Sequence, residues 1–462
     1  MIDLEFVLFR DLVSKLTYSL LELFPGHYGR AFSLFREKKR LYELKSRQEL
    51  IKYQKKSLIS LLKLHSKNVI YSGIIKKTGI PSDENFDLYS YLSGFPILTK
   101  EFVQTNFEAL KTTGATGVFI NSSGGSTGTP VNFWQDRVYS ENSLATTYLS
   151  DSIQLWRPGC REARLWGAPK DIRQIEGLRG RFFLYLKNQL WLDSFNMGPG
   201  RMQYYHDLLE KFRPEVLISY ASSIFLFAQY LKEARIKPDY GLRSIISSAE
   251  TLYPNMRGLI EEVFGVKVFN RYGSREVGNM ASECEMHDGM HLHMYDHIIE
   301  TIPAGKEANE FGKEGELAVT CLTNYSMPVI RYKIGDTGLI TGRECRCKSG
   351  ALMLEKLYGR TSDSIFTKDK NIIHGEYFTH IFYGMKGIRE FQFVQRDYEN
   401  YEIRLLVSKD YDRQCESVIR EECARVLGGN INLEIKYADA IEPLSASGKR
   451  RFTISMLDKT KG

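Results

Sequence analysis

Short β-rich runs alternate with helical runs along the middle of the chain, from about residue 100 to about residue 340. The run PEVLISY at 214–220 leads into ASSIFLFAQYLKEA, LRSIISSAE at 242–250 leads into TLYPNMRGLIEEVFG, and VKVFNRYG follows at 266–273. Apolar runs of this length, each followed by a helical pattern, are typical of strands buried between helices. The alternation therefore predicts a layered α/β fold for this region.

The regions on either side have a different texture. The first hundred residues have mainly helical patterns, which Pro96 interrupts before Thr99, a residue suited to cap a new helix. Near the C-terminus, 391–410 indicates two strands, 415–429 a helix that ends at Gly428, and 431–440 a further strand. A chain of 462 residues is too long to form one compact core. We therefore predict a helical extension at 1–45, a large α/β domain at 46–358 and a small α+β domain at 359–462.

Composition restricts the function classes only weakly. The 63 Lys and Arg residues against 56 Asp and Glu give a formal charge of +7, which is spread along the chain. The densest basic stretch, 36–56, has helical spacing and acidic partners, which favours a solvated helix face over a membrane-surface or nucleic-acid patch. The sequence has no run of about 18 apolar residues, no signal-peptide pattern and no disulfide framework among its seven Cys. We expect a cytoplasmic protein without a transmembrane segment that binds no nucleic acid.

The stretch 121–130, NSSGGSTGTP, contains three Gly and five Ser or Thr. Gly allows backbone N–H groups to converge on an anion, and the hydroxyl groups add further donors. The stretch is not a nucleotide P-loop, because Thr129 follows Gly128 where that motif requires Lys. By itself, such a stretch is either a phosphate-binding loop or a flexible surface connection.

Five segments, in this order, resemble the signature of the adenylate-forming (acyl-CoA synthetase-like) superfamily. They are SSGGSTGTP at 122–130, NRYGSREVG at 270–278, VIRYKIGDTGLI at 329–340, YGRTSD at 358–363 and LSASGKRRF at 444–452. The segments FPILTKEFVQTNF, SSAETL and SECEMHDGMHLH resemble the branch of the phenylacetate-CoA ligases and the capsular polysaccharide biosynthesis (CapK-like) proteins. The resemblance implies an AMP-binding adenylation domain at 46–358 and a small mobile lid domain at 359–462.

The resemblance also implies a reaction in which a carboxylic acid and ATP give an acyl-adenylate and pyrophosphate. Glu276 would bind Mg²⁺, the alternative being an acid at a helix N-terminus. Asp336 would accept hydrogen bonds from the ribose hydroxyls, the alternative being a turn Asp. The β- and γ-phosphates would be held by Ser122, Ser123, Gly124, Gly125, Ser126, Thr127 and Gly128.

Two cationic residues near the C-terminus receive roles from the same resemblance. Lys449 would neutralise the charge that develops between the carboxylate and the α-phosphate, whereas an exposed loop Lys without a role is the alternative. Arg360 would bind phosphate or ribose, although Ser362 stands where the family commonly has an acidic residue or Lys at its hinge. The adenine and acyl pocket would include Ser248, Ala249, Glu250, Asn270, Arg271, Tyr272 and Gly273, with core packing as the alternative for Tyr272.

Four further residues suggest a metal site. His291 follows Cys284 by seven residues, and Cys345 and Cys347 form a C-x-C pair. Three thiolates and one imidazole suit structural Zn²⁺, and four unconnected residues are the alternative. The pattern resembles one found in this branch of ligases, and Cys160, Cys321, Cys415 and Cys423 lack such spacing. We predict a Zn²⁺ that joins the 284–293 loop to the 345–347 turn, with His287 and His293 as substitutes for His291.

We expect an ATP-dependent carboxylate ligase that passes the acyl group to coenzyme A, as the resemblance to phenylacetate-CoA ligases implies. A second interpretation transfers the acyl group to an amine during capsular or surface polysaccharide biosynthesis. A third is a nucleotide-binding protein that has lost catalysis and serves as a regulator or scaffold. The motifs do not distinguish the two acceptors, and they do not name the acid.

Overall fold

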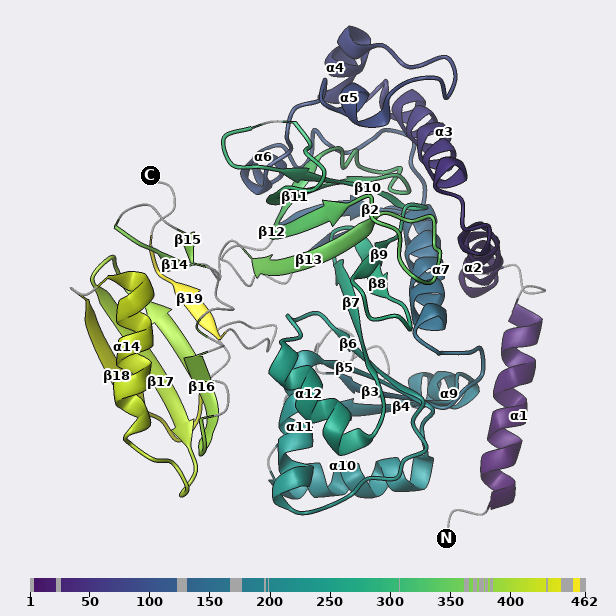
Figure 1. Cartoon of the computed structure of the whole chain (residues 1–462). Helices are drawn as coiled ribbons and strands as arrows, with labels where there is room; N and C mark the ends of the chain where they lie inside the picture. Colours follow the sequence, from purple (N-terminus) through teal and green to yellow (C-terminus); the bar gives the residue numbers. More distant parts are fainter. Residues whose placement is uncertain are drawn as a thin grey trace. The chain divides into compact units, whose positions relative to one another are not determined.

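The structure is a computed structural model of the chain (Figure 1). It describes residues 4–21, 26–122, 131–166, 177–194, 197, 199–306, 308–360, 365–368, 372–373, 378, 381–382, 385–428, 431–441 and 452–457. The chain divides into two compact units: among the described residues, the larger unit contains those up to 356 except 335–337, and the smaller unit contains 335–337 and those from 357 onwards. No helix in these ranges is both long and apolar enough to cross a membrane. The domain boundaries at 45 and 358 stay predictions.

Eleven of the described strands form one sheet in the larger unit, in the order β10-β11-β12-β13-β9-β8-β7-β6-β5-β3-β4 (Figure 1). Neighbouring strands in one half run parallel. These are β4 (Gln189–Asp193), β3 (Glu162–Trp166), β5 (Val216–Tyr220), β6 (Ser244–Ser248) and β7 (Val268–Ser274). Every residue of β5 and β6 is buried, as expected for parallel strands covered on both faces. The predicted layered α/β fold with a separate C-terminal domain is confirmed.

Helices connect the parallel strands: α9 (Gly177–Leu186), α10 (Pro199–Phe212), α11 (Ala221–Glu233) and α12 (Pro254–Phe264). The two strand-to-helix transitions predicted from the sequence are present as β5 into α11 and β6 into α12. Pro254 occupies the first turn of α12, and Gly265 ends that helix with φ of 68°, a left-handed conformation that favours glycine. The helical crossovers place the carboxyl ends of β3, β5, β6 and β7 at one edge of the sheet.

The other half of the sheet contains antiparallel pairs, among them β7 with β8, β8 with β9, β9 with β13, and β10 with β11. Its strands are β8 (Gly278–Glu283), β9 (Met290–Leu292), β10 (His297–Ile302), β11 (Glu314–Cys321), β12 (Tyr332–Thr341) and β13 (Met353–Arg360). Helix α7 (Arg137–Ile153) packs against β8. Asp136 caps α7, because its side chain accepts a hydrogen bond from the Tyr139 N–H at 2.8 Å. A hairpin of β1 (Phe119–Ser122) and β2 (Asn132–Gln135) precedes this helix.

The predicted helical character of the first hundred residues is confirmed. The helices are α1 (Leu4–Leu20), α2 (His27–Glu43), α3 (Arg47–His65), α4 (Tyr71–Thr78), α5 (Leu88–Leu92) and α6 (Lys100–Thr105). Thr99 caps α6 as predicted, and its side chain accepts from the Phe102 N–H at 3.2 Å.

Helix α2 packs against α7 and contributes a buried charge to the larger unit. Lys38 is 2% exposed, forms an ion pair with Asp296 and donates to the Thr146 hydroxyl at 2.9 Å. Burial lowers the pKa of Lys38, and the Asp296 carboxylate opposes this shift. Helix α2 is therefore part of this unit and supplies a cation to its interior.

The smaller unit has its own sheet and core. Its strands β16 (Ile388–Gln395), β17 (Asn400–Val407), β18 (Asn432–Tyr437) and β19 (Thr453–Ser455) are ordered β18-β17-β16-β19, and β14 (Ile365–Phe366) pairs with β15 (Ile372–Ile373). Helix α14 (Cys415–Leu427) buries Ile419 and Cys423 in the same core as Phe393 and Ile403. Two strands, a helix ending at Gly428 and a further strand were predicted here, and all are present.

Candidate functional site

The two strands that flank the glycine-rich stretch are hydrogen-bonded to the turn that carries Glu276. Asn121, on β1, donates from Nδ2 to the Arg275 carbonyl at 3.2 Å. Gln135, on β2, donates from Nε2 to the carbonyls of Arg275 and Glu276, both at 3.1 Å. These side chains lie on either side of the 123–130 stretch, which lies outside the described residues. Both strands of the hairpin are therefore joined to the backbone of the turn at Arg275 and Glu276.

The backbone of the turn is tightly constrained, which positions Glu276. The register between β7 and β8 shifts between Tyr272 and Gly273. A Cβ atom at Gly273 would come within 2.8 Å of the Gly278 carbonyl oxygen, so only glycine fits here. Gly278 closes the turn with φ of 83°. Glu276 is 8% exposed, and its carboxylate is thus held by a rigid backbone rather than by a flexible loop.

The carboxyl edge of the parallel strands gathers several predicted pocket residues. Tyr220, Ser248 and Arg271 occupy neighbouring positions on β5, β6 and β7. Ala249 follows with φ of 70°, a left-handed conformation that is uncommon for a residue with a side chain. Glu250 accepts from the Ser222 N–H at 2.8 Å, so its carboxylate lies at the N-terminus of α11 and satisfies a free donor there.

The side chain of Arg271 forms an ion pair with Asp151 on α7. Its Nη1 donates to Asp151 at 2.5 Å, its Nε donates to the Ser248 hydroxyl at 3.3 Å, and both charged side chains are buried. Burial raises the pKa of Asp151, and the nearby guanidinium opposes this. This ion pair joins α7 to β7, the strand that also carries Asn270. The Asn270 N–H donates to Glu283 at 2.8 Å, and the Asn270 carbonyl accepts from Gln154 at 2.8 Å.

The remaining predicted nucleotide-site residues are only partly described. Ser122 lies at the end of β1 and donates to Asn132 Oδ1 at 2.7 Å, and Tyr272 lies buried on β7. Asp336 is half-buried within β12. Arg360 ends β13, but its side chain lies outside the described part of the chain. Also outside it lie Ser362, Lys449, and the loop residues Ser123, Gly124, Gly125, Ser126, Thr127 and Gly128.

The four predicted zinc ligands come together. The sulfur atoms of Cys284, Cys345 and Cys347 and a ring nitrogen of His291 all lie within 4.8 Å of one another. The Cys284 and Cys345 sulfurs are 3.7 Å apart, and His291 Nε2 lies 3.4 Å from Cys284 Sγ and 3.3 Å from Cys347 Sγ. A tetrahedral zinc ion about 2.3 Å from each sulfur and about 2.0 Å from nitrogen would separate its ligands by about 3.5 to 3.8 Å. The donor set and its spacing fit that ion.

The surroundings of this Cys/His cluster hold the ligands in place. The N–H groups of Met286 and Ser349 lie 3.5 and 3.4 Å from the Cys284 and Cys347 sulfurs, and partial burial beside the three thiols raises the pKa of the Tyr42 hydroxyl on α2. Burial raises the pKa of the Cys284 thiol to about 12. A buried thiolate therefore needs a cation, and a bound metal ion supplies one.

The two substitute histidines lie apart from the sulfur atoms. His287 Nδ1 is 3.3 Å from Glu283 and 3.4 Å from Arg257. His293 is buried, and burial lowers its pKa well below the ordinary value. Of the three candidates, His291 is the one that the structure groups with the three thiols.

Comparisons with known proteins show what the chain as a whole resembles. Residues 365–456 match the family model of the CapK C-terminal domain. Protein CapK of Staphylococcus aureus is 26% identical over 94% of this chain and 93% of its own length. A phenylacetate-coenzyme A ligase of Escherichia coli is 27% identical over 71% of this chain and 75% of its own. The chain is similar to these members of the adenylate-forming superfamily over most of its length, and it is an adenylate-forming ligase.

Solved structures of this superfamily share the fold. A 2-hydroxyisobutyryl-CoA ligase, solved in the postadenylation state with an acyl-AMP, superimposes with a TM-score of 0.67 at 17% identity and covers 88% of this chain and 89% of its own. The amide bond synthetase McbA of Marinactinospora thermotolerans superimposes with a TM-score of 0.52 at 15% identity, over 72% of this chain and 67% of its own. The same architecture is thus present in a CoA ligase and in an amide synthetase.

Sequence reasoning missed three features of this ligase. Asn121 and Gln135 carry no motif of their own, and only their hydrogen bonds to the 275–276 backbone reveal them. Trp166 and Tyr220 form an aromatic pair at the ends of β3 and β5, with ring centroids 4.3 Å apart. Their position at strand ends was a usable signal, because ligands of open α/β sheets bind at that edge.

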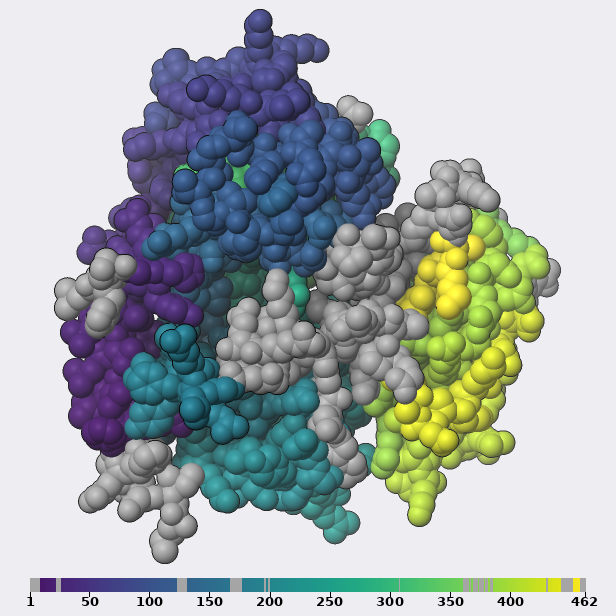
Figure 2. All heavy atoms as spheres, turned by 180° about the vertical axis from the view of Figure 1, so that it is seen from behind, coloured from purple at the N-terminus to yellow at the C-terminus, as the bar shows by residue number. Residues whose placement is uncertain are grey.

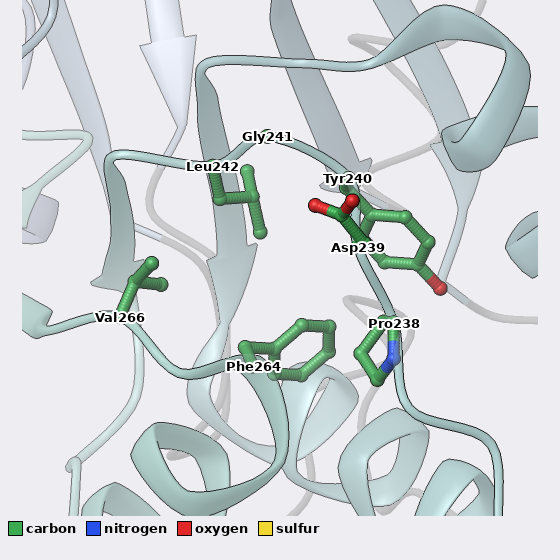
Figure 3. Close-up of a pocket in the computed structure, with 7 residues that line it drawn as sticks. All are labelled: Pro238, Asp239, Tyr240, Gly241, Leu242, Phe264 and Val266. Atoms are coloured by element: carbon green, nitrogen blue, oxygen red, sulfur yellow. The ribbon is translucent and has the colours of Figure 1, made fainter.

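A cavity of about 200 Å³ lies at the opposite edge of the sheet (Figure 3). It is lined by the segment 238–242, which leads into β6, and by Phe264 and Val266, which precede β7. The cavity therefore adjoins the amino ends of these strands. Ser248, Ala249 and Glu250 of the predicted pocket lie at the carboxyl end of β6 and just beyond it, so this cavity is separate from them.

Proposed function

We propose that this ligase joins a carboxylic acid to coenzyme A through an acyl-adenylate. In the first half-reaction, a carboxylate oxygen attacks the α-phosphorus of ATP, and the bond to the leaving pyrophosphate breaks. In the second, the coenzyme A thiol attacks the acyl carbon, loses its proton, and releases AMP. Two kinds of relative support the proposal: the phenylacetate-CoA ligases in sequence and the 2-hydroxyisobutyryl-CoA ligase in fold.

One observation carries this proposal: the hydrogen bonds that join the glycine-rich hairpin to the Glu276 turn. Asn121 and Gln135 bring the stems of a stretch rich in N–H and hydroxyl donors next to a buried, rigidly held carboxylate. Donors and a carboxylate in one place suit a nucleotide triphosphate together with its cation. The hairpin would hold the β- and γ-phosphates so that pyrophosphate leaves in a fixed direction.

Glu276 fits the Mg²⁺ that ATP chemistry requires. Its carboxylate is a hard oxygen donor, and the hydrogen bond from Gln135 uses its backbone carbonyl, which leaves the carboxylate free of that contact. When bound, Mg²⁺ neutralises charge on the phosphate oxygens. The chain itself would position the phosphates through the hairpin, and the lid residue Lys449 would approach the carboxylate and the α-phosphate.

The acyl group would lie at the carboxyl ends of the parallel strands. Trp166 and Tyr220 offer an aromatic surface there, and Ser248, Ala249 and Glu250 form the adjoining turn after β6. An aromatic wall beside few polar groups favours an apolar or aryl acid. We propose an aryl carboxylic acid as the substrate class.

We propose that the Cys/His cluster holds a structural Zn²⁺. Four ligands of the soft type that zinc prefers would fill its tetrahedral shell and leave no open position for a substrate. The ion would fasten the 284–291 segment to the 345–347 turn, and it would take no part in acyl transfer.

Pyrophosphate release tests the proposed reaction. The purified chain is incubated with ATP, Mg²⁺ and one acid from a panel of aryl, fatty, amino and sugar acids, with and without coenzyme A. We expect release with aryl acids and faster turnover with coenzyme A, with the acyl-CoA identified by mass spectrometry. Release that coenzyme A leaves unchanged but an amine accelerates would replace the thioester with an amide, and so favour the role in capsular or surface polysaccharide biosynthesis. ATP binding without release for any acid would contradict catalysis.

The proposed reaction also bears on location. Both ATP and coenzyme A are cytoplasmic metabolites, so we propose that the ligase acts in the cytoplasm.

A further inference from the structure

Two neighbouring helices of the larger unit carry large apolar side chains on the protein surface. On α1 these side chains recur at intervals of three and four residues, which places them on one face of the helix. On α9 they lie within the first seven residues of the helix. We call this set the α1–α9 face. It comprises Phe9 (59% exposed), Leu12 (55%), Leu16 (52%) and Leu20 (44%) on α1, and Leu178 (87%), Phe182 (59%) and Phe183 (49%) on α9.

The exposed side chains of the α1–α9 face are additional to those that α1 packs against the rest of the unit. The opposite side of α1 already packs inward: Tyr18 is buried, with its ring 5.7 Å from that of Trp156 and 6.3 Å from that of Tyr148. Arg10 fixes α1 beside α9, because its guanidinium lies 5.3 Å from the Tyr185 ring and donates to the Leu184 carbonyl at 3.4 Å. Figures 1 and 2 show the two helices side by side from opposite directions.

The exposed charged side chains that the structure describes on these helices have one sign. Lys15, Arg179 and Arg181 are exposed between the apolar side chains. Within 9–20 and 177–187, Asp11 is the acidic residue that the structure describes, and it faces the protein. Its carboxylate accepts from Arg161 at 3.3 Å and from Asn188 at 2.8 Å. The α1–α9 face is therefore apolar with a basic border.

We propose that the α1–α9 face docks on the surface of an anionic lipid bilayer. Phe and Leu side chains on a helix face gain free energy by entering the boundary between headgroups and acyl chains, while Lys and Arg extend to the lipid phosphates. Each cation near such a surface adds to the attraction. A second copy of the chain fits less well, because a two-fold interface would bring together two patches that are both basic.

Docking through this face uses none of the residues assigned to the nucleotide, acyl and zinc sites. The proposal therefore adds a location for the enzyme without changing its chemistry, and it is independent of which acid the enzyme activates.

Vesicle co-sedimentation of the full chain tests the proposal. One vesicle preparation contains phosphatidylglycerol and phosphatidylcholine, and a second contains phosphatidylcholine alone. We expect the chain to sediment with the anionic vesicles, to bind the neutral vesicles much less, and to be released as salt rises, since salt screens exposed charges. Sedimentation with neither preparation would overturn the proposal.

Three pairs of substitutions locate the contact. Arg179→Gln with Arg181→Gln is expected to weaken binding about 30-fold, from the loss of two cations near the surface. Leu12→Ser with Leu16→Ser, and Leu178→Ser with Phe182→Ser, are each expected to weaken it at least about tenfold. Matched controls are Val69→Ser and Val418→Ser, which change exposed apolar side chains elsewhere and should bind like the unaltered chain.

Two further measurements separate the alternatives. Pyrophosphate release without lipid should be the same for all variants, which shows that each one is folded. Light scattering reports the oligomeric state: a dimer in the unaltered chain that dissociates in the Leu→Ser pairs would assign the α1–α9 face to a second copy. Vesicle binding that survives all three pairs would place the lipid contact elsewhere and also overturn the proposal.

Discussion

The Glu276 turn and the Cys/His cluster lie on the same sheet, but different interactions hold them. Neutral amide side chains, Asn121 and Gln135, tie the glycine-rich hairpin to the Glu276 turn, and each such hydrogen bond has a net value of about 1 kcal/mol. In the cluster, three thiols and an imidazole converge on one point, where a cation would bind all four. We propose that the first region positions the reacting groups and that the second stabilises the fold.

The largest expected effect tests the stabilising role of the cluster. Cys345→Ser removes a zinc ligand and should lower the free energy of unfolding by on the order of 4 kcal/mol, since loss of a structural metal is among the most damaging changes. Thermal denaturation with zinc analysis of the purified chain measures it. Cys415→Ser is the matched control, because Cys415 is half-buried and outside the cluster. Unchanged stability with full zinc content would contradict this ligand assignment.

A comparable effect, on activity rather than stability, is expected at the turn. Glu276→Gln keeps the size of the side chain but removes its charge, so pyrophosphate release should fall about 100- to 1000-fold, as on loss of one electrostatic contact to a transition state. The melting temperature should stay the same. Glu285→Gln changes an exposed Glu nearby and serves as the control. Lost stability with retained activity would instead make Glu276 a structural residue.

A smaller effect should separate positioning from binding. Gln135→Ala removes two hydrogen bonds to the turn and should slow pyrophosphate release about tenfold, which corresponds to about 1.4 kcal/mol. Because the carboxylate of Glu276 remains, the decrease should appear in kcat more than in the KM for ATP. Steady-state kinetics at several ATP concentrations measure both constants, and a change in KM alone would show that Gln135 acts in binding.

The smallest effect concerns the contact between α2 and the cluster. Tyr42→Phe removes a half-buried hydroxyl of α2 that lies beside the three thiols of the cluster and should weaken zinc retention about fivefold, or about 1 kcal/mol. Competition with a chelator measures zinc affinity. Pyrophosphate release should be unaffected, and a loss of activity would mean that the cluster and the active site are coupled.

The sequence predicts local features of this molecule better than its long-range contacts. Thr99 was expected to cap a helix because the signal lies within three residues, and it does so. The grouping of Cys284 with Cys345 was predictable because few residue types bind zinc. Gln135 and its partners are 140 residues apart or more, and amides with no special spacing give no hint of such a contact. The roles assigned to Lys449 and Glu276 stay predictions, because they rest on resemblance alone.

The buried ion pair of Lys38 and Asp296 should constrain how the sequences of homologues vary. A chain that began at Ser46 would keep Asp296 in the interior without its cation, at a cost of about 3 to 5 kcal/mol. Helix α2 therefore cannot be gained or lost in a descendant unless the position of Asp296 changes in the same lineage. Homologues that lack this helix should carry an uncharged residue at that position, so the two features should be inherited together.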